Sequence, residues 1–337
     1  MRSVEGLRGA VTVTRAGSVE VELAGGLADA GSGARCTPRT RFQIASVSKQ
    51  FAATAVMLLA ESGTVELGEP VARWLPGSLP QWRRVTLHHL LTHTAGVRHW
   101  DGAPGFEPSQ PMDIADRLAL ILRAPLLSEP GTHWRYSSPG YVLVGHIVAR
   151  ASGRAYPGFL TERVLSPLGL ASTTVGGGPA GTAVARGYRD GQPVAPWDLS
   201  TMPGTGDLCS TVGDLARYTT ALHTGRLLGD GSLRLMCTPH APVSSGEAPS
   251  GEGPSGEASS DDGPSDGGNA GGRWLTGDSY GYGHFIGTIG GQTAYFHPGD
   301  NPGYQSFAAW LPGQAASVAI LANDEAASIE GLLRQLL

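Results

Sequence analysis

Lysine is almost absent from this sequence. The 337 residues include 24 Lys and Arg residues, and all of them except Lys49 are arginine. A general drift of basic positions toward arginine would explain the other positions but not the single lysine that remains. Chance is the alternative explanation for that one lysine. Arginine is not deprotonated in proteins, whereas a buried lysine can lose its proton near neutral pH. Lys49 is therefore a candidate for a residue that takes up and releases a proton.

Long hydrophobic runs and cysteine are also scarce. No apolar run reaches about 18 residues, so we expect no membrane span and no membrane partner. Residues 1–8 lack the apolar stretch of a signal peptide, which predicts a cytoplasmic protein. The three cysteines, Cys36, Cys209 and Cys237, are odd in number and widely spaced. This pattern favours buried free thiols over a disulfide framework or a zinc site.

The sequence contains no metal-spaced His/Cys cluster and no phosphate-binding loop, so we predict no metal and no cofactor. Its net charge of -5 comes from one segment, because residues 244–272 contain six acidic residues and no basic one. The rest of the chain is near neutral without a basic run, which argues against nucleic acid as a partner.

Residues 244–272 also contain no Val, Leu, Ile or aromatic residue. Such a segment buries too little apolar surface to offset the entropy lost on ordering. We therefore interpret residues 241–274 as a disordered surface loop.

The hydrophobic pattern predicts strands at both ends of the chain and helices between them. Residues 10–14 and 19–23 alternate as two strands around a turn at Ala16-Gly17, and residues 46–62 form a strong helix that ends at Gly63. Further helices are predicted at 86–92, 114–122, 141–151, 212–222 and 326–336, and further strands at 283–289, 293–297, 304–311 and 317–322. No internal repeat is found. This order predicts one sheet built from both ends of the chain around a helical insertion.

Ser46-Val47-Ser48-Lys49 opens the first predicted helix. At this spacing Ser46 and Lys49 lie on one helical face, one turn apart. A serine hydroxyl is a weak nucleophile until an adjacent base takes its proton, and a neutral lysine can act as that base. The Ser46 N–H also lies at the helix start, where the dipole favours developing negative charge. By itself, the pattern would favour a helix-capping serine beside a solvated lysine, because Ser-x-x-Lys often occurs by chance.

The surrounding sequence resembles the β-lactamase and penicillin-binding-protein superfamily, and most closely its class C β-lactamases, D-Ala-D-Ala carboxypeptidases and related serine esterases and transesterases. The resemblance covers nearly the whole chain. Matching segments follow in family order: Phe42–Lys49, Leu90–Gly96, Pro130–Tyr141, Pro167–Leu170, Gly206–Thr211 and His297-Pro298-Gly299, which stands where the family has its third motif on an edge strand.

The resemblance implies an α/β (α+β) fold of the β-lactamase/transpeptidase type, with an antiparallel sheet domain from residues 1–62 and 275–337 and a mainly helical domain inserted at residues 63–240. It also implies roles for residues. Ser46 would be the nucleophile, Lys49 its base and Tyr136 a second proton carrier. The N–H groups of Ser46 and Asp300 would form the oxyanion hole.

Ser138, His297, Gly299, Asp300 and Tyr282 would line the substrate site. A packed aromatic is the alternative for Tyr136, and a strand-end histidine without a role is the alternative for His297. His93 is expected to support the site structurally.

Three positions depart from the family pattern. Ser138 replaces the usual Asn and offers one hydroxyl where an amide offers both a donor and an acceptor. Pro298 replaces a Thr that helps to hold a substrate carboxylate, and it has neither a hydroxyl nor an N–H. Asp300 places a carboxylate where Gly is common and would repel an anionic substrate. These changes argue against β-lactamase or D-Ala-D-Ala carboxypeptidase activity.

The sequence therefore predicts an enzyme that forms an acyl-enzyme at Ser46 with a small-molecule ester or amide. Hydrolysis and transfer of the acyl group to another acceptor share this first step, and the sequence does not separate them. A non-catalytic binding domain on the same fold is the alternative from another class. The sequence makes no prediction of oligomeric state.

Overall fold

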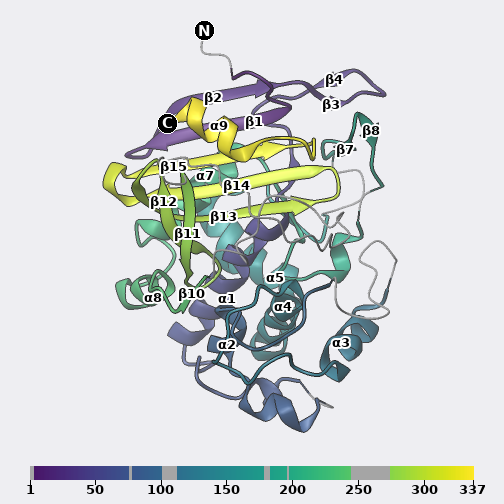
Figure 1. Cartoon of the computed structure of the whole chain (residues 1–337), viewed down its shortest axis with the longest axis vertical. Helices are drawn as coiled ribbons and strands as arrows, with labels where there is room; N and C mark the ends of the chain where they lie inside the picture. Colours follow the sequence, from purple (N-terminus) through teal and green to yellow (C-terminus); the bar gives the residue numbers. More distant parts are fainter. Residues whose placement is uncertain (1–3, 76–77, 101–111, 178–182, 196, 244–273) are drawn as a thin grey trace, which may run out of the picture.

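The fold is described from a computed structural model of the chain, over residues 4–337 except 76–77, 101–111, 178–182, 196 and 244–273. One large antiparallel sheet dominates it, with strands in the order β10-β11-β12-β13-β14-β15-β1-β2 (Figure 1). The strands are β1 (Gly9–Arg15), β2 (Ser18–Gly25), β10 (Ala241–Pro242), β11 (Leu275–Tyr280), β12 (Phe285–Ile289), β13 (Gln292–Asn301), β14 (Tyr304–Leu311) and β15 (Ala316–Ala322). Both ends of the chain contribute to this sheet, which confirms the predicted fold class.

The six helices with predicted bounds begin and end within three residues of those bounds. They are α1 (Ser48–Glu61), α2 (Leu87–Leu91), α3 (Ile114–Arg123), α4 (Ser138–Ser152), α7 (Val212–His223) and α9 (Ile329–Leu336). The short helices α5 (Tyr156–Leu160), α6 (Ser166–Leu168) and α8 (Asp230–Met236) were not predicted. Side-chain caps stabilise the first turn of several of these helices. In each, the capping side chain accepts a hydrogen bond from a backbone N–H of that turn; the capping residues are Thr86, Asp113, Ser137, Thr211 and Ser328.

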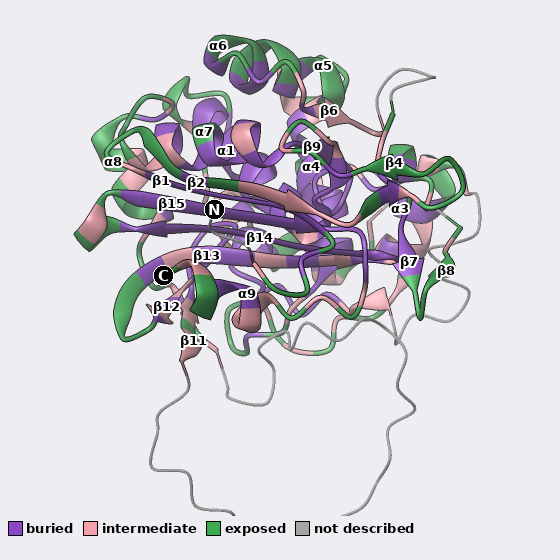
Figure 2. Ribbon diagram, turned by 90° about the horizontal axis from the view of Figure 1, so that it is seen from above, coloured by how far each residue is buried: buried purple, intermediate pink, exposed green. Residues whose placement is uncertain are grey.

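The central strands are buried on both faces of the sheet. Because successive side chains of a strand point to opposite faces, they belong alternately to two hydrophobic clusters. In β15, Ala319 and Leu321 belong to the cluster that includes α1 and α7, whereas Val318 and Ile320 belong to the cluster that includes α9. Figure 2 shows these strands as buried layers between helices. The α7 helix packs on β15, β1 and β14, so one helix of the predicted helical domain covers the sheet. The domain bounds themselves remain a prediction.

Three details differ from the sequence-based predictions. The first long helix begins at Ser48, because a 3-10 turn over Ala45–Val47 precedes it. The predicted loop 241–274 starts with strand β10, which pairs with β11, and its residues 244–273 lie outside the described part of the chain. Strand β13 is interior to the sheet, but β12 pairs with it only as far as Phe296. The third motif therefore occupies a local edge within an interior strand.

A small three-stranded sheet, β5-β9-β6, lies beside the start of α1. It consists of β5 (Phe42–Gln43), β9 (Leu208–Ser210) and β6 (Thr174–Val175). The described residues also form two short strand pairs, β3 (Leu27–Asp29) with β4 (Ala34–Arg35) and β7 (Tyr188–Arg189) with β8 (Gln192–Pro193). None of the helices in the described ranges has both the length and the apolar character that crossing a membrane requires. Cys36 and Cys209 are buried free thiols as predicted, and Cys237 is half-buried.

Candidate active site

Ser46 lies in the tight turn between β5 and α1, and its backbone is held from several sides. The Ile44 N–H donates to the Leu208 carbonyl at 3.0 Å, and the Ser306 hydroxyl donates to the Ile44 carbonyl at 2.7 Å. Ala45 has a φ of +45°, a left-handed conformation that is costly for a residue with a side chain. Neighbouring segments thus hold a strained turn that leaves Ser46 half-buried at the head of α1.

Lys49 is completely buried, and its Nζ atom has three hydrogen-bond partners. The Ser46 Oγ lies at 2.9 Å, the Thr205 carbonyl at 3.0 Å and the Ser138 Oγ at 3.2 Å. A carbonyl oxygen can only accept a hydrogen bond, whereas a hydroxyl can donate or accept. A neutral amine has two N–H groups and one lone pair. It can therefore donate to Thr205 and Ser138 while it accepts from Ser46.

Burial lowers the pKa of Lys49 well below its ordinary value, because the charged form loses its hydration. The nearby carboxyl groups of Asp300 and Asp207 act in the opposite direction and raise that pKa by a smaller amount. Burial also raises the pKa values of both acids, to about 8 for Asp207. The buried groups around Ser46 are thus held toward their uncharged forms, which leaves the Lys49 amine able to accept a proton.

Tyr136 and Ser138 lie at the start of α4, across from Lys49. The Lys49 Nζ lies 4.8 Å from the centre of the Tyr136 ring. Burial raises the pKa of the Tyr136 hydroxyl, and hydrogen bonds with Ser46 and Ser138 lower it by a smaller amount. Tyr136 is therefore a neutral phenol whose hydroxyl reaches the Ser46 side chain. The Ser138 hydroxyl contacts Lys49, so this serine keeps one contact that an Asn would be expected to make.

Two histidines hold the segment from Tyr136 to Ser138 through its backbone. His93 Nδ1 accepts from the Ser137 N–H at 3.1 Å, and His99 Nδ1 accepts from the Ser138 N–H at 3.1 Å. The His93 ring also packs at 4.5 Å from the ring of Tyr136, and burial lowers its pKa well below the ordinary value. His93 thus has the supporting position that the sequence predicted. No pattern in the sequence pointed to His99, although it follows the Leu90–Gly96 signature by only three residues.

The third motif lies directly against the Ser46 turn. A β-carbon added to Gly299 would lie 2.8 Å from the Ser46 nitrogen and 2.6 Å from the Ser306 Oγ, so only glycine fits there. This close approach places the uncovered edge of β13, which includes Asp300, beside the Ser46 N–H. The Asn301 amide continues the contact by donating to the Gln43 Oε1 at 2.7 Å.

His297 is completely buried beneath this edge. Its Nδ1 hydrogen bonds to the Pro298 carbonyl, which is an acceptor, so Nδ1 carries the proton. Its Nε2 then accepts from the Tyr280 hydroxyl at 3.0 Å. The His297 and Tyr136 ring centres are 6.1 Å apart. These bonds give His297 a position behind the site, where it supports β13 and the aromatic cluster around Tyr136.

Tyr282 lies in a separate cluster. Its hydroxyl hydrogen bonds to His88 Nδ1 at 2.8 Å, and its ring stacks on His240 at 4.4 Å. Only 2% of Tyr282 is exposed. These contacts join the Tyr282 side chain to His88 and His240, whereas the contacts described above join the other predicted site residues to one another around Lys49.

Residues 204–207 form the wall behind Lys49, and the sequence predicted no role for them beyond the match of Gly206 and Asp207 to a family segment. The Thr205 carbonyl accepts from Lys49, while the fully buried Asp207 accepts from the Gly204 N–H at 3.1 Å. The Ser48 hydroxyl in turn accepts from the Leu208 N–H at 3.2 Å. This wall therefore connects Lys49 to the strand that supports the Ser46 turn.

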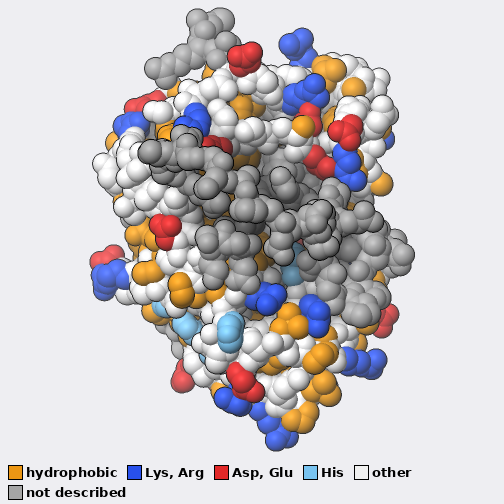
Figure 3. Space-filling view, in the orientation of Figure 1, with side chains coloured by type: hydrophobic (Ala, Val, Ile, Leu, Met, Phe, Trp, Pro, Cys, Tyr) orange, Lys and Arg blue, Asp and Glu red, His pale blue; other side chains and the backbone are white. Residues whose placement is uncertain are grey.

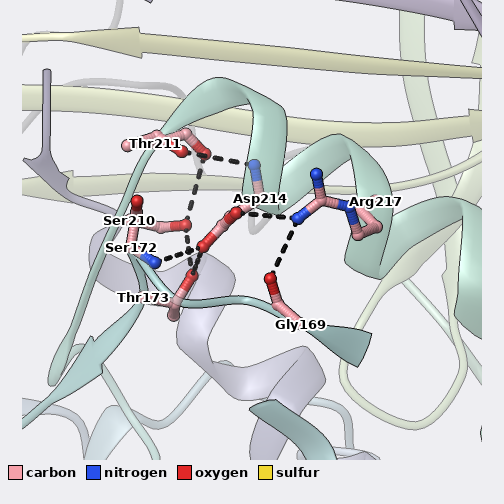
Figure 4. A network of polar contacts seen from close by, with 7 residues as sticks. All are labelled: Gly169, Ser172, Thr173, Ser210, Thr211, Asp214 and Arg217. Atoms are coloured by element: carbon pink, nitrogen blue, oxygen red, sulfur yellow. Dashed lines mark hydrogen bonds and ion pairs between the residues drawn. The ribbon is translucent and has the colours of Figure 1, made fainter. Parts of the chain in front are cut away.

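Residues in and near two of the matching segments, Pro167–Leu170 and Gly206–Thr211, meet in a polar network at the start of α7 (Figure 4). Asp214 accepts from the Ser172 N–H and the Thr173 hydroxyl at 2.8 and 3.0 Å, and Thr173 contacts the Ser210 hydroxyl at 2.8 Å. Arg217 joins Asp214 to the Gly169 carbonyl. The network anchors β9 and the start of α7, and thereby the segment that faces Lys49.

No set of three or more His, Cys, Asp or Glu side chains within the described ranges could hold a metal ion. The arrangement has instead the parts of a serine acyl-transfer site. These are a hydroxyl beside a buried amine, a neutral phenol, and a backbone edge beside the nucleophile's N–H.

Comparisons with known proteins agree with this geometry. The family model described as Beta-lactamase matches residues 3–331. The esterase EstB of Burkholderia gladioli is 37% identical over 205 residues, which cover 56% of this chain and 52% of EstB. The putative penicillin-binding protein PbpX of Bacillus subtilis is 28% identical over 248 residues, which cover 72% of this chain and 61% of PbpX. The chain thus spans a little more than half the length of these two curated relatives.

A solved structure gives the same fold. The D-amino acid amidase of Ochrobactrum anthropi SV3, complexed with L-phenylalanine, superposes with a TM-score of 0.77 at 25% identity. The match covers 97% of this chain and 90% of the amidase.

Proposed function

Because this chain belongs to the β-lactamase family, we propose that it is a serine acyl hydrolase that cleaves small neutral esters or amides through an acyl-enzyme at Ser46. The observation that carries the proposal is the completely buried Lys49 amine, which lies 2.9 Å from the Ser46 hydroxyl. The esterase and the amidase among the similar proteins support the class of reaction.

In the first half-reaction, Lys49 takes the Ser46 hydroxyl proton while the Ser46 Oγ attacks the substrate carbonyl. The tetrahedral oxyanion receives hydrogen bonds from the N–H groups of Ser46 and Asp300. The Tyr136 hydroxyl donates a proton to the leaving group and regains one from the Lys49 ammonium. These transfers return Lys49 to its neutral form and leave Ser46 esterified.

In the second half-reaction, water attacks the acyl-enzyme. Tyr136 takes the proton of the attacking water while it passes its own hydroxyl proton to Lys49, and the Lys49 ammonium then protonates the Ser46 Oγ as the bond between the acyl group and Ser46 breaks. An alcohol or amine acceptor would follow the same route, because only the attacking group differs. We propose hydrolysis because the named esterase and amidase support it.

The electrostatics of the third motif favour neutral substrates. Pro298 offers no hydroxyl or N–H to a substrate carboxylate, and the half-buried Asp300 places an acid beside the proposed oxyanion hole. When ionised, that acid would disfavour an anionic substrate by about 1–4 kcal/mol at close range. We therefore propose esters or amides without a carboxylate, in preference to β-lactams and D-Ala-D-Ala peptides.

Intact-mass spectrometry after brief reaction with p-nitrophenyl esters tests the proposal. We expect a mass increase equal to the acyl group, located on Ser46 by peptide mapping, and no such adduct in Ser46→Ala. Adding alcohols or amines tests acyl transfer, because a transferase would form the new ester or amide faster than the free acid. Steady ester turnover by Ser46→Ala would show that the nucleophile has been misassigned.

A further inference from the structure

The burial of Lys49 limits where the proton that it takes from Ser46 can go next. Lys49 is the only lysine of the chain and is completely buried. The basic side chains that Figure 3 shows on the surface are therefore arginines, which do not release protons. The hydrogen bonds of the Lys49 amine lead to the Ser46 Oγ, the Thr205 carbonyl and the Ser138 Oγ. A carbonyl oxygen has no proton to exchange, so the two serine hydroxyls are the direct routes.

One of these two routes closes during the reaction. In the free enzyme, the Ser46 hydroxyl connects Lys49 to Tyr136, because it hydrogen bonds with both. Once the Ser46 Oγ has attacked, it is bonded to the acyl carbon and has no hydrogen to pass on. The Ser138 hydroxyl still connects the same two groups, because it hydrogen bonds with Tyr136 and its Oγ lies 3.2 Å from the Lys49 Nζ.

The Ser138 hydroxyl is held where it can make both contacts. Only 6% of Ser138 is exposed, and its backbone N–H donates to His99 Nδ1 at 3.1 Å. A hydroxyl has one hydrogen, which rotates toward either neighbour, and lone pairs that accept a proton from the other. The amide of an Asn, which is usual at this position in the family, has its donor and its acceptor on different atoms. The replacement of Asn by Ser thus puts a group that can relay a proton between Lys49 and Tyr136.

We propose that Ser138 relays protons between Lys49 and Tyr136 while Ser46 is bonded to the acyl group. The inference rests on the proposed acyl-hydrolase function and adds a residue to its chemistry. As the bond to the leaving oxygen breaks, Tyr136 gives its hydroxyl proton to that oxygen. Ser138 gives its proton to the Tyr136 oxygen, and the Lys49 ammonium gives one to the Ser138 oxygen. The leaving group departs as an alcohol, and all three side chains end neutral.

In the second half-reaction the protons move in the opposite direction. Tyr136 takes a proton from the attacking water and passes its own to Ser138, and Ser138 passes its hydroxyl proton to the neutral Lys49 amine. The Lys49 ammonium then protonates the Ser46 Oγ, to which it is 2.9 Å away, as the acyl group leaves as the free acid. Each residue thus returns to its starting form.

The test compares ethyl acetate with p-nitrophenyl acetate in Ser138→Asn, whose amide can still contact Lys49 but does not relay a proton. Both esters form the same acetyl-enzyme at Ser46, but p-nitrophenolate leaves as an anion whereas ethoxide needs a proton. We expect kcat/KM for ethyl acetate to fall about a hundredfold or more, which is the usual size of a lost proton transfer. For p-nitrophenyl acetate, kcat/KM should stay within about threefold of the wild type, because Lys49 takes the Ser46 proton directly.

Accumulation of the acetyl-enzyme is the second measurement. Deacylation needs the relay for both esters, so the steady-state kcat of Ser138→Asn for p-nitrophenyl acetate should also fall about a hundredfold. A rapid burst of p-nitrophenolate and an acetyl adduct in the intact mass should therefore appear in this variant. Ser138→Ala should behave in the same way, which keeps the test valid if Ser138→Asn fails to fold.

Two further variants are controls. Ser138→Thr keeps a hydroxyl and should stay within about fivefold of the wild type for both esters. Ser152→Asn makes the same exchange at the opposite end of α4 and should behave as the wild type.

Equal losses of kcat/KM for the two esters without accumulation of acetyl-enzyme would overturn the relay and leave Ser138 as a residue that positions Lys49. Wild-type kinetics in Ser138→Asn would overturn it as well. Both results leave the acyl-hydrolase function in place, because Ser46 is still acylated. Failure of the wild type to form an acetyl-enzyme at Ser46 with either ester would overturn the proposed function and, with it, the relay.

Discussion

His99 Nδ1 lies 3.1 Å from the backbone nitrogen of Ser138 and accepts its hydrogen bond. This bond joins the segment after the Leu90–Gly96 signature to the start of α4, where Tyr136 and Ser138 face Lys49. Loss of an acceptor for a buried donor costs about 1–3 kcal/mol. In this position, the loss would displace groups that we propose to transfer protons.

We therefore predict that His99→Leu lowers kcat for a short neutral ester at least tenfold with little change in KM. His99→Asn should keep activity within about threefold of the wild type, because its side-chain oxygen can take the place of Nδ1. Steady-state kinetics with p-nitrophenyl acetate provide the measurement. Equal activity of the wild type and His99→Leu would show that the bond is not needed to position Tyr136 and Ser138.

Lys49→Arg should reduce kcat/KM almost as much as Lys49→Ala, by about a thousandfold, although it keeps a basic side chain. The reason is that arginine does not release its proton, so it cannot serve as a general base. Arg73 is exposed and forms an ion pair with Glu69, so Arg73→Lys is a control for the effect of exchanging arginine and lysine away from the site. Substantial activity in Lys49→Arg would make Lys49 an electrostatic residue and exclude it as the base.

Asp207→Asn should change how stability depends on pH. Burial raises the pKa of Asp207 to about 8, so the folded protein keeps this proton between about pH 4 and 8 while the unfolded chain loses it. The Asp207 contribution to stability therefore falls as pH rises through this window, by at most about 1.4 kcal/mol per pH unit. Asparagine does not titrate and keeps the acceptor for the Gly204 N–H.

We accordingly expect the free energy of unfolding of Asp207→Asn, measured by urea titration, to rise relative to the wild type from pH 4 to pH 8 and to level off above it. A difference that does not vary with pH would show that Asp207 is ionised in the folded protein at neutral pH.

Asp300→Asn should selectively improve anionic substrates. Burial raises the pKa of the Asp300 carboxyl, so its ionised fraction grows as pH rises and its repulsion of anions grows with it. In the wild type, the ratio of kcat/KM for p-nitrophenyl butyrate to that for the monoester of succinic acid should increase with pH. We expect this ratio to be smaller and nearly constant with pH in Asp300→Asn. The same pH trend in both proteins would assign the discrimination to other groups.

Several features followed from the sequence alone. Periodicity places the strands of residues 10–14 and 304–311 and the helix of residues 212–222 because each pattern reflects one local geometry and one buried face. The pairing of Ser46 with Lys49 also follows, since three residues of helix bring two side chains onto one face. The single lysine is also the residue that we propose as the base, because arginine does not release its proton.

Other features depend on contacts between distant parts of the chain. Local pattern cannot show that His99 reaches Ser138, that the Thr205 carbonyl reaches Lys49, or that Gly299 lies against the Ser46 turn. The short strands β10 and β11 had no clear pattern of their own and are held by pairing with their neighbours. The sequence thus determined which groups could perform the chemistry. Only the tertiary structure decided their protonation and placement, because burial sets the pKa of Lys49 and long-range hydrogen bonds hold Tyr136 and Ser138 against it.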